Sequence, residues 1–127
     1  MKYIKTSTKT VDQIALELET VVPAKGFGLL HVHNLKATMN AKGVDFQPEC
    51  RVFEVCNPHK AHQVLSQDIH LNMVLPCRIS VWEEDQQVRI GTLLPTKLLG
   101  MLSDAQELQS PAQEVEAILC DIIDQVV

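Results

Sequence analysis

Hydrophobic positions recur along this chain with two different periods. Between residues 11 and 22 the apolar side chains fall at helical spacing, and Thr10 and Gln13 form a capping box ahead of them. A second helical stripe follows Ser110 and Pro111, which are a suitable N-cap and first-turn proline. We therefore expect one amphipathic helix near each end of the chain.

Alternating or continuous apolar runs predict strands between and before these helices. The strands are expected at about residues 2–6, 27–33, 51–56, 77–82 and 88–93. Shorter helices are expected at 34–43, 58–67 and 95–101, each beside an N-cap residue, a glycine or a proline. The resulting order, β-α-β-α-β-α-β-β-α-α, predicts a single α+β domain with a small mixed sheet of about five strands and helices packed against it.

The last helix raises a question of domain organisation. A polar stretch at 104–109 precedes it, so we divide the chain into an α+β domain at 1–103 and a linker with an amphipathic helix at 104–127. An apolar stripe from Val115 to Val126 covers one face of that helix. The stripe could pack on the sheet of its own chain, which we favour, or on a dimer partner.

Composition narrows the classes of function. The chain has 127 residues, of which 46% are hydrophobic and 21% are charged, as in ordinary globular proteins. Its net charge is -5 and its basic residues are scattered, which argues against nucleic-acid binding. No stretch approaches the roughly 20 apolar residues of a membrane span, and no signal peptide is evident. We expect a cytoplasmic protein whose four cysteines are reduced thiols.

The residues most able to carry chemistry lie between 56 and 77. If Asn57 caps the helix that follows, Cys56 lies at a helix N-terminus, where backbone N–H groups and the helix dipole favour a thiolate. His59 and His62 are three positions apart on that helix, and either imidazole could accept a proton or bind a metal. Cys77 begins the next strand, and it could face the same cleft as Cys56.

A plainer interpretation competes with this one. A buried cysteine is often a small apolar side chain that fills the core, and a histidine on a helix is usually solvated. A structural zinc site is disfavoured because the chain has no C-x-x-C pair. No motif of a conventional hydrolase, kinase or nucleotide-binding enzyme is present, and we assign no catalytic residue.

Several short motifs occur in an order that resembles domain-of-unknown-function family 302. They are Gly43-Val44-Asp45-Phe46-Gln47-Pro48, Cys56-Asn57-Pro58, His62, Leu75-Pro76-Cys77 and Val81-Trp82-Glu83. The resemblance covers roughly residues 9 to 103, and the chain is similar to the subgroup with paired cysteines in the C-N-P and L-P-C motifs. It implies an α+β fold and a homodimer. It implies no settled activity and supplies no catalytic residues.

Two functional hypotheses follow. The first is a cytosolic ligand-binding or thiol-redox accessory protein in which Cys56 and Cys77 line a cleft, with Asn57, His59 and His62 close by. Its ligand could be a persulfide, a soft metal held by Cys56 and His62, or haem. The second is a non-catalytic homodimeric module that binds a protein partner. An enzyme acting on a small molecule is a weaker third hypothesis, because it rests only on cooperation between His62 and a thiol of low pKa.

Overall fold

Five strands and five α-helices follow one another in the order that the sequence pattern predicts. The computed structural model describes all 127 residues. The elements are β1 (Lys2–Ser7), α1 (Val11–Ala24), β2 (Gly28–Asn34), α2 (Leu35–Ala41), β3 (Cys50–Cys56), α3 (Pro58–Gln67), β4 (Cys77–Glu84), β5 (Gln87–Leu93), α4 (Pro95–Leu102) and α5 (Gln109–Val126). Two short 3₁₀ helices, η1 (Ile69–Val74) and η2 (Gln106–Leu108), complete the chain. The predicted single α+β domain is confirmed.

The strands form one sheet in the order β1-β5-β4-β3-β2. All four neighbouring pairs are antiparallel, which corrects the expectation of a mixed sheet. The two strands of the β1-α1-β2 unit run in the same direction, but they lie at opposite edges because β1 pairs with β5. No parallel pair therefore forms.

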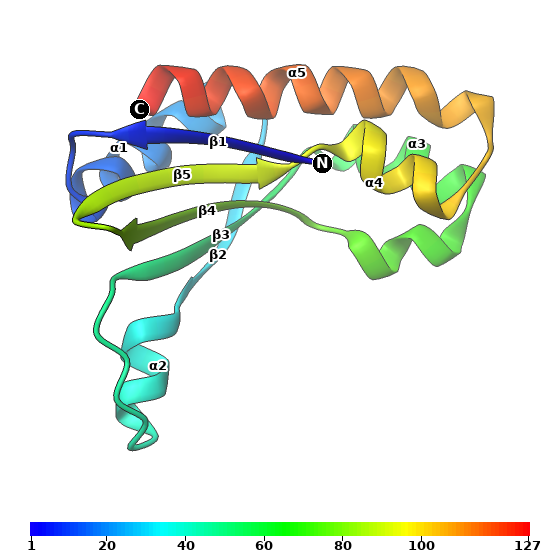
Figure 1. Ribbon diagram of the computed structural model, residues 1–127. Coiled ribbons are helices and arrows are strands. Elements are labelled where there is room, and N and C mark those ends of the chain that lie inside the picture. The colour runs from blue at the N-terminus through cyan, green and yellow to red at the C-terminus, as the bar shows by residue number, and fades with distance from the viewer.

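Helices α1 and α5 cover one face of the sheet (Figure 1). The capping box predicted at Thr10 and Gln13 is present at the start of α1. The core beneath these helices joins Ile14 and Leu18 of α1 to Leu119 and Ile122 of α5, and all four side chains are fully buried. The apolar stripe of α5 therefore packs on the sheet of its own chain.

The start of α5 differs from the sequence prediction. The helix begins at Gln109, directly after η2, and no side chain caps it. The hydroxyl of Ser110, expected to be the N-cap, instead donates to Oε1 of Glu114 at 3.3 Å. The segment before it is more than a polar linker, because Leu108 is buried.

A second, smaller core lies beyond the ends of the strands. It consists of five buried residues from α3, η1, α4, η2 and α5, namely Val64, Leu71, Leu99, Leu108 and Ala112. In contrast, α2 has no buried residue and projects away from the sheet, on the side opposite α5 (Figure 1). None of the helices combines the length and the hydropathy that a membrane-spanning helix needs.

Candidate functional site

An apolar pocket of about 280 Å³ lies between the two cores. Its walls come from the ends of β3 and β5, the start of β4, the first turns of α3 and α5, the end of η1, and α4. Its lining residues are Phe27, Val55, Cys56, Asn57, Lys60, Ala61, Val64, Met73, Val74, Leu75, Pro76, Cys77, Arg78, Thr92, Leu93, Pro95, Leu98, Leu99, Pro111, Ala112 and Val115. Fourteen of these 21 residues are hydrophobic, so the pocket suits an apolar group.

Local sequence signals place several of these walls. Asn57 is the N-cap of α3, as predicted, and its Oδ1 accepts from the backbone N–H groups of His59 at 3.0 Å and Lys60 at 3.2 Å. Pro95 begins α4, where its missing N–H needs no partner, and Pro76 directly precedes β4. These turns bring the starts of three elements to one end of the sheet.

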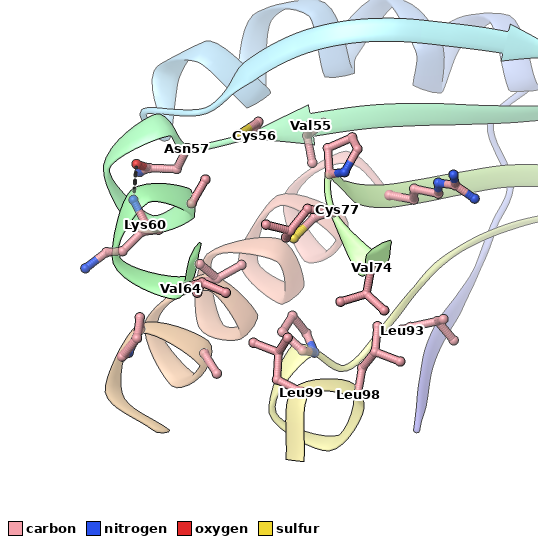
Figure 2. Close-up of a pocket in the computed structure, with 18 of the residues that line it drawn as sticks. Val55, Cys56, Asn57, Lys60, Val64, Val74, Cys77, Leu93, Leu98 and Leu99 are labelled. Atoms are coloured by element: carbon pink, nitrogen blue, oxygen red, sulfur yellow. Dashed lines mark hydrogen bonds between the residues drawn. The ribbon is translucent and has the colours of Figure 1, made fainter. Parts of the chain in front are cut away.

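Cys56, Asn57 and Cys77 meet at this pocket, but the two thiols point in different directions. Val55 lies opposite Cys77 in the β3–β4 register, so their side chains share a face. Cys56 follows Val55, and side chains alternate along a strand, so its thiol belongs to the other face. Figure 2 shows Cys77 directed toward Val64 and Leu99, with Cys56 turned away from them. Cysteines whose Cβ atoms diverge in this way cannot form a disulfide without backbone movement.

Both thiols are held in the neutral form. Burial raises the pKa of the Cys77 thiol to about 11, and the nearby Cys56 thiol contributes to the increase. Burial also raises the pKa of Cys56, the opposite direction from the one that a helix N-terminus would cause. The first N–H groups of α3 already donate to Asn57, so they do not stabilise a thiolate at Cys56. Neither cysteine is an activated nucleophile in this arrangement.

The two histidines of α3 lie outside the pocket. His59 and His62 are exposed, and neither is among the lining residues. No group of three or more His, Cys, Asp or Glu side chains is arranged to hold a metal ion. The pocket therefore combines the two predicted cysteines and Asn57 with apolar side chains, and the predicted imidazoles face solvent.

The sequence interpretation missed most of the pocket walls. Lys60, Val64 and Leu99 line the pocket, but the sequence did not single them out. The prolines were a usable signal. Pro76 lies before β4, Pro95 begins α4 and Pro111 lies near the start of α5, and all three line the pocket. Prolines at the starts of successive elements mark backbone turns, and here those turns meet.

Comparison with known proteins agrees with the fold. The model of the family described as "Domain of unknown function DUF302" matches residues 3–126, which includes α5 and extends beyond the resemblance at 9–103. The crystal structure of an uncharacterized conserved DUF302 protein from Bacillus stearothermophilus is similar, with a TM-score of 0.92 and 28% sequence identity. The similarity covers 99% of this chain and 98% of that one. A search of curated proteins found no match. The chain belongs to the DUF302 family.

Proposed function

We propose that this protein binds a small apolar molecule in the pocket and that ligand binding, rather than thiol redox chemistry, is its function. The observation that carries this proposal is an apolar cavity of about 280 Å³ at the meeting point of seven elements. A ligand that enters such a cavity removes its apolar surface from water, and this favours binding by roughly 25 cal/mol of free energy for each Å² buried. Cys77 would act as part of the wall, as a neutral and polarisable side chain.

The other ligands expected for a cleft lined by cysteine and histidine have less support. A persulfide carrier or a redox pair needs a reactive thiolate, and burial raises the pKa of both Cys56 and Cys77. A soft metal would need a further donor beside Cys56, and His62 is exposed outside the pocket. Haem is a large ligand. The cavity of about 280 Å³ lies below the roughly 300 to 1,000 Å³ of pockets that hold drug-sized ligands, so it is too small for haem.

A neutral apolar dye, N-phenyl-1-naphthylamine, tests the proposal by fluorescence. We expect saturable binding of one dye per chain, and at least tenfold weaker binding to Ala61→Phe, whose ring would occupy the pocket. Ala117→Phe is the matched control, because Ala117 is exposed on α5 and does not line the pocket. Circular dichroism would verify that both variants fold. Equal binding by the two variants, or no binding by the wild type, would overturn the proposal.

A cytosolic location belongs to the same proposal. All four cysteines are free thiols, as is usual in a reducing compartment. Separating cytosolic and membrane fractions of the source cells and detecting the protein with an antibody would test this part directly.

A second candidate function is a homodimeric interaction module, supported by the exposed edge strand β2. Edge strands present unpaired backbone groups that can pair with another chain. The opposite edge, β1, contains Lys2 and Lys5, but β2 contains no lysine and exposes Leu30 at 60% and Val32 at 37%. A second copy pairing antiparallel through β2 would join the two sheets. Burial of the apolar stripe of α5 in its own core leaves that helix unavailable for the same role.

Native mass spectrometry distinguishes this candidate from a monomeric binder. Leu30→Lys should convert a dimer into monomers, because it places a charge at the β2 edge. Leu16→Lys changes a similarly exposed leucine, 67% exposed on α1, and should leave the dimer intact. A wild-type monomer at micromolar concentration, or a dimer unaffected by Leu30→Lys, would argue against assembly through β2.

A further inference from the structure

Exposed apolar side chains surround the mouth of the pocket. Two residues that line it, Met73 of η1 and Leu93 of β5, are 78% and 49% exposed, so the pocket opens between these two elements. Figure 2 shows Leu93 and Leu98 beside Val74, the residue that follows Met73. Apolar side chains therefore continue from the pocket wall to the outer surface, which is typical of an interaction site.

The same surface extends over α4 and the start of β1, which lie next to each other in Figure 1. Met101 and Leu102 are exposed, and they follow the lining residue Leu98 by three and four positions, which places them beside it on α4. Ile4 is also exposed and shares a sheet face with Leu93 in the β1–β5 register. We call these five side chains the rim surface: Ile4, Met73, Leu93, Met101 and Leu102.

The segments that carry the rim surface have only basic charged residues. They are η1, α4 and residues 1–4 and 91–94. They contain Lys2, His70 and Lys97 but no Asp or Glu, although the formal net charge of the chain is -5. Neither lysine forms an ion pair, whereas five other lysines are paired with acids. The rim surface therefore combines apolar side chains with two free cations.

We infer that the rim surface binds an anionic lipid membrane, with its apolar side chains against the bilayer and Lys2 and Lys97 near lipid phosphates. Exposed apolar side chains and free lysines together are features of proteins that bind at a membrane surface. The choice of a membrane over a protein partner rests on the proposed function, because an apolar ligand concentrates in lipid rather than in water. A pocket that opens at such a surface can exchange its ligand with the bilayer directly.

The distribution of charge supports this partner. A second copy docked through the same surface would bring Lys2 and Lys97 of both chains together, which is unfavourable. Of the two acids that flank these segments in the sequence, Asp68 contacts His70 at 3.6 Å and Asp104 lies beyond the end of α4. The net charge of -5 would repel an anionic membrane at long range, but at about 0.1 M salt charges act over only about 10 Å. The local charge therefore decides the contact.

Sedimentation with vesicles tests the inference. One set contains phosphatidylcholine alone, and the other contains equal parts of phosphatidylcholine and phosphatidylglycerol. We expect at least tenfold stronger binding to the anionic set, because each free lysine contributes about fivefold, and high salt should reduce this preference. Equal binding to both sets would overturn the inference. No binding to either set, the result expected if a second copy or another protein covers this surface, would also overturn it. Dye binding measured without vesicles is independent, so it would leave the apolar-binding proposal standing.

Matched variants locate the contact, with circular dichroism to verify folding. Met73→Glu should bind anionic vesicles at least tenfold more weakly, and Leu16→Glu, at an exposed leucine of α1, should have a much smaller effect. Lys97→Gln should weaken binding about fivefold, and Lys42→Gln, at an exposed lysine just past α2, should leave it nearly unchanged. Equal losses within either pair would assign the binding to net charge and overturn the inference. Ala61→Phe fills the pocket but spares the rim surface, so loss of vesicle binding in this variant would overturn the assignment to the rim surface.

Discussion

The ionisation of Cys77 gives the most quantitative prediction. Burial raises the pKa of this thiol from 9.0 to about 11, and a shift of two units means that about 100-fold less thiolate is present at pH 8. The thiolate is the form that reacts with iodoacetamide. A variant with Cys50, Cys56 and Cys120 replaced by serine leaves Cys77 as the only thiol, and burial, the largest cause of the shift, remains.

Mass spectrometry would follow alkylation of this variant in the folded state and in urea. At pH 8 we expect the folded protein to react about 100-fold more slowly, before any additional effect of restricted access. Restricted access lowers the rate equally at every pH, so the pH profile separates it from ionisation. The folded rate should rise about tenfold per pH unit until the pH approaches 11. A plateau near pH 9 would refute the reasoning.

The same shift predicts a loss of stability at alkaline pH. Above about pH 9 the unfolded chain releases the Cys77 proton, but the folded chain keeps it until about pH 11. The contribution is therefore complete below pH 9 and is lost as the pH rises to 11, by up to about 2 to 3 kcal/mol. Urea unfolding of wild type and Cys77→Ser at pH 8 and pH 10.5 measures it, because other titrating groups largely cancel in the difference. A difference that is the same at both pH values would contradict the prediction.

Three further predictions concern stability, two of them checked by urea unfolding and one by amide exchange. Leu119→Ala should lower the free energy of unfolding by about 2 to 5 kcal/mol because Leu119 is fully buried, and Leu16→Ala, at a leucine that is 67% exposed, should change it by less than about 0.5 kcal/mol. Gly91→Ala should weaken the β1–β5 pairing, since an added Cβ would lie 2.9 Å from the carbonyl oxygen of Tyr3, and faster amide exchange in β1 would report this. Asn57→Ala should cost about 0.5 to 2 kcal/mol through loss of the α3 cap, and an unchanged midpoint would show that the cap contributes little.

Much of the fold could be predicted from short stretches of sequence. Thr10 and Asn57 begin α1 and α3 as expected, because a cap depends on a side chain and the backbone two or three residues later. The alternation before and after the turn at Asp85 predicts β4 and β5, because side chains on neighbouring residues of a strand point to opposite faces. The prediction at Ser110 was wrong because the chain enters α5 directly from η2, which removes the need for a separate cap.

The sequence by itself determined the elements, their order and the reduced state expected of the cysteines, since these depend on local periods, caps and composition. Only the tertiary structure decided how the site is assembled. Cys56 and Cys77 come together through the β3–β4 register, and that register places their thiols on opposite faces. Val64 and Leu99 line the same pocket from separate elements, with no local motif joining them. Strand register and the packing of distant elements depend on the whole chain, so the pocket could be found only in the folded molecule.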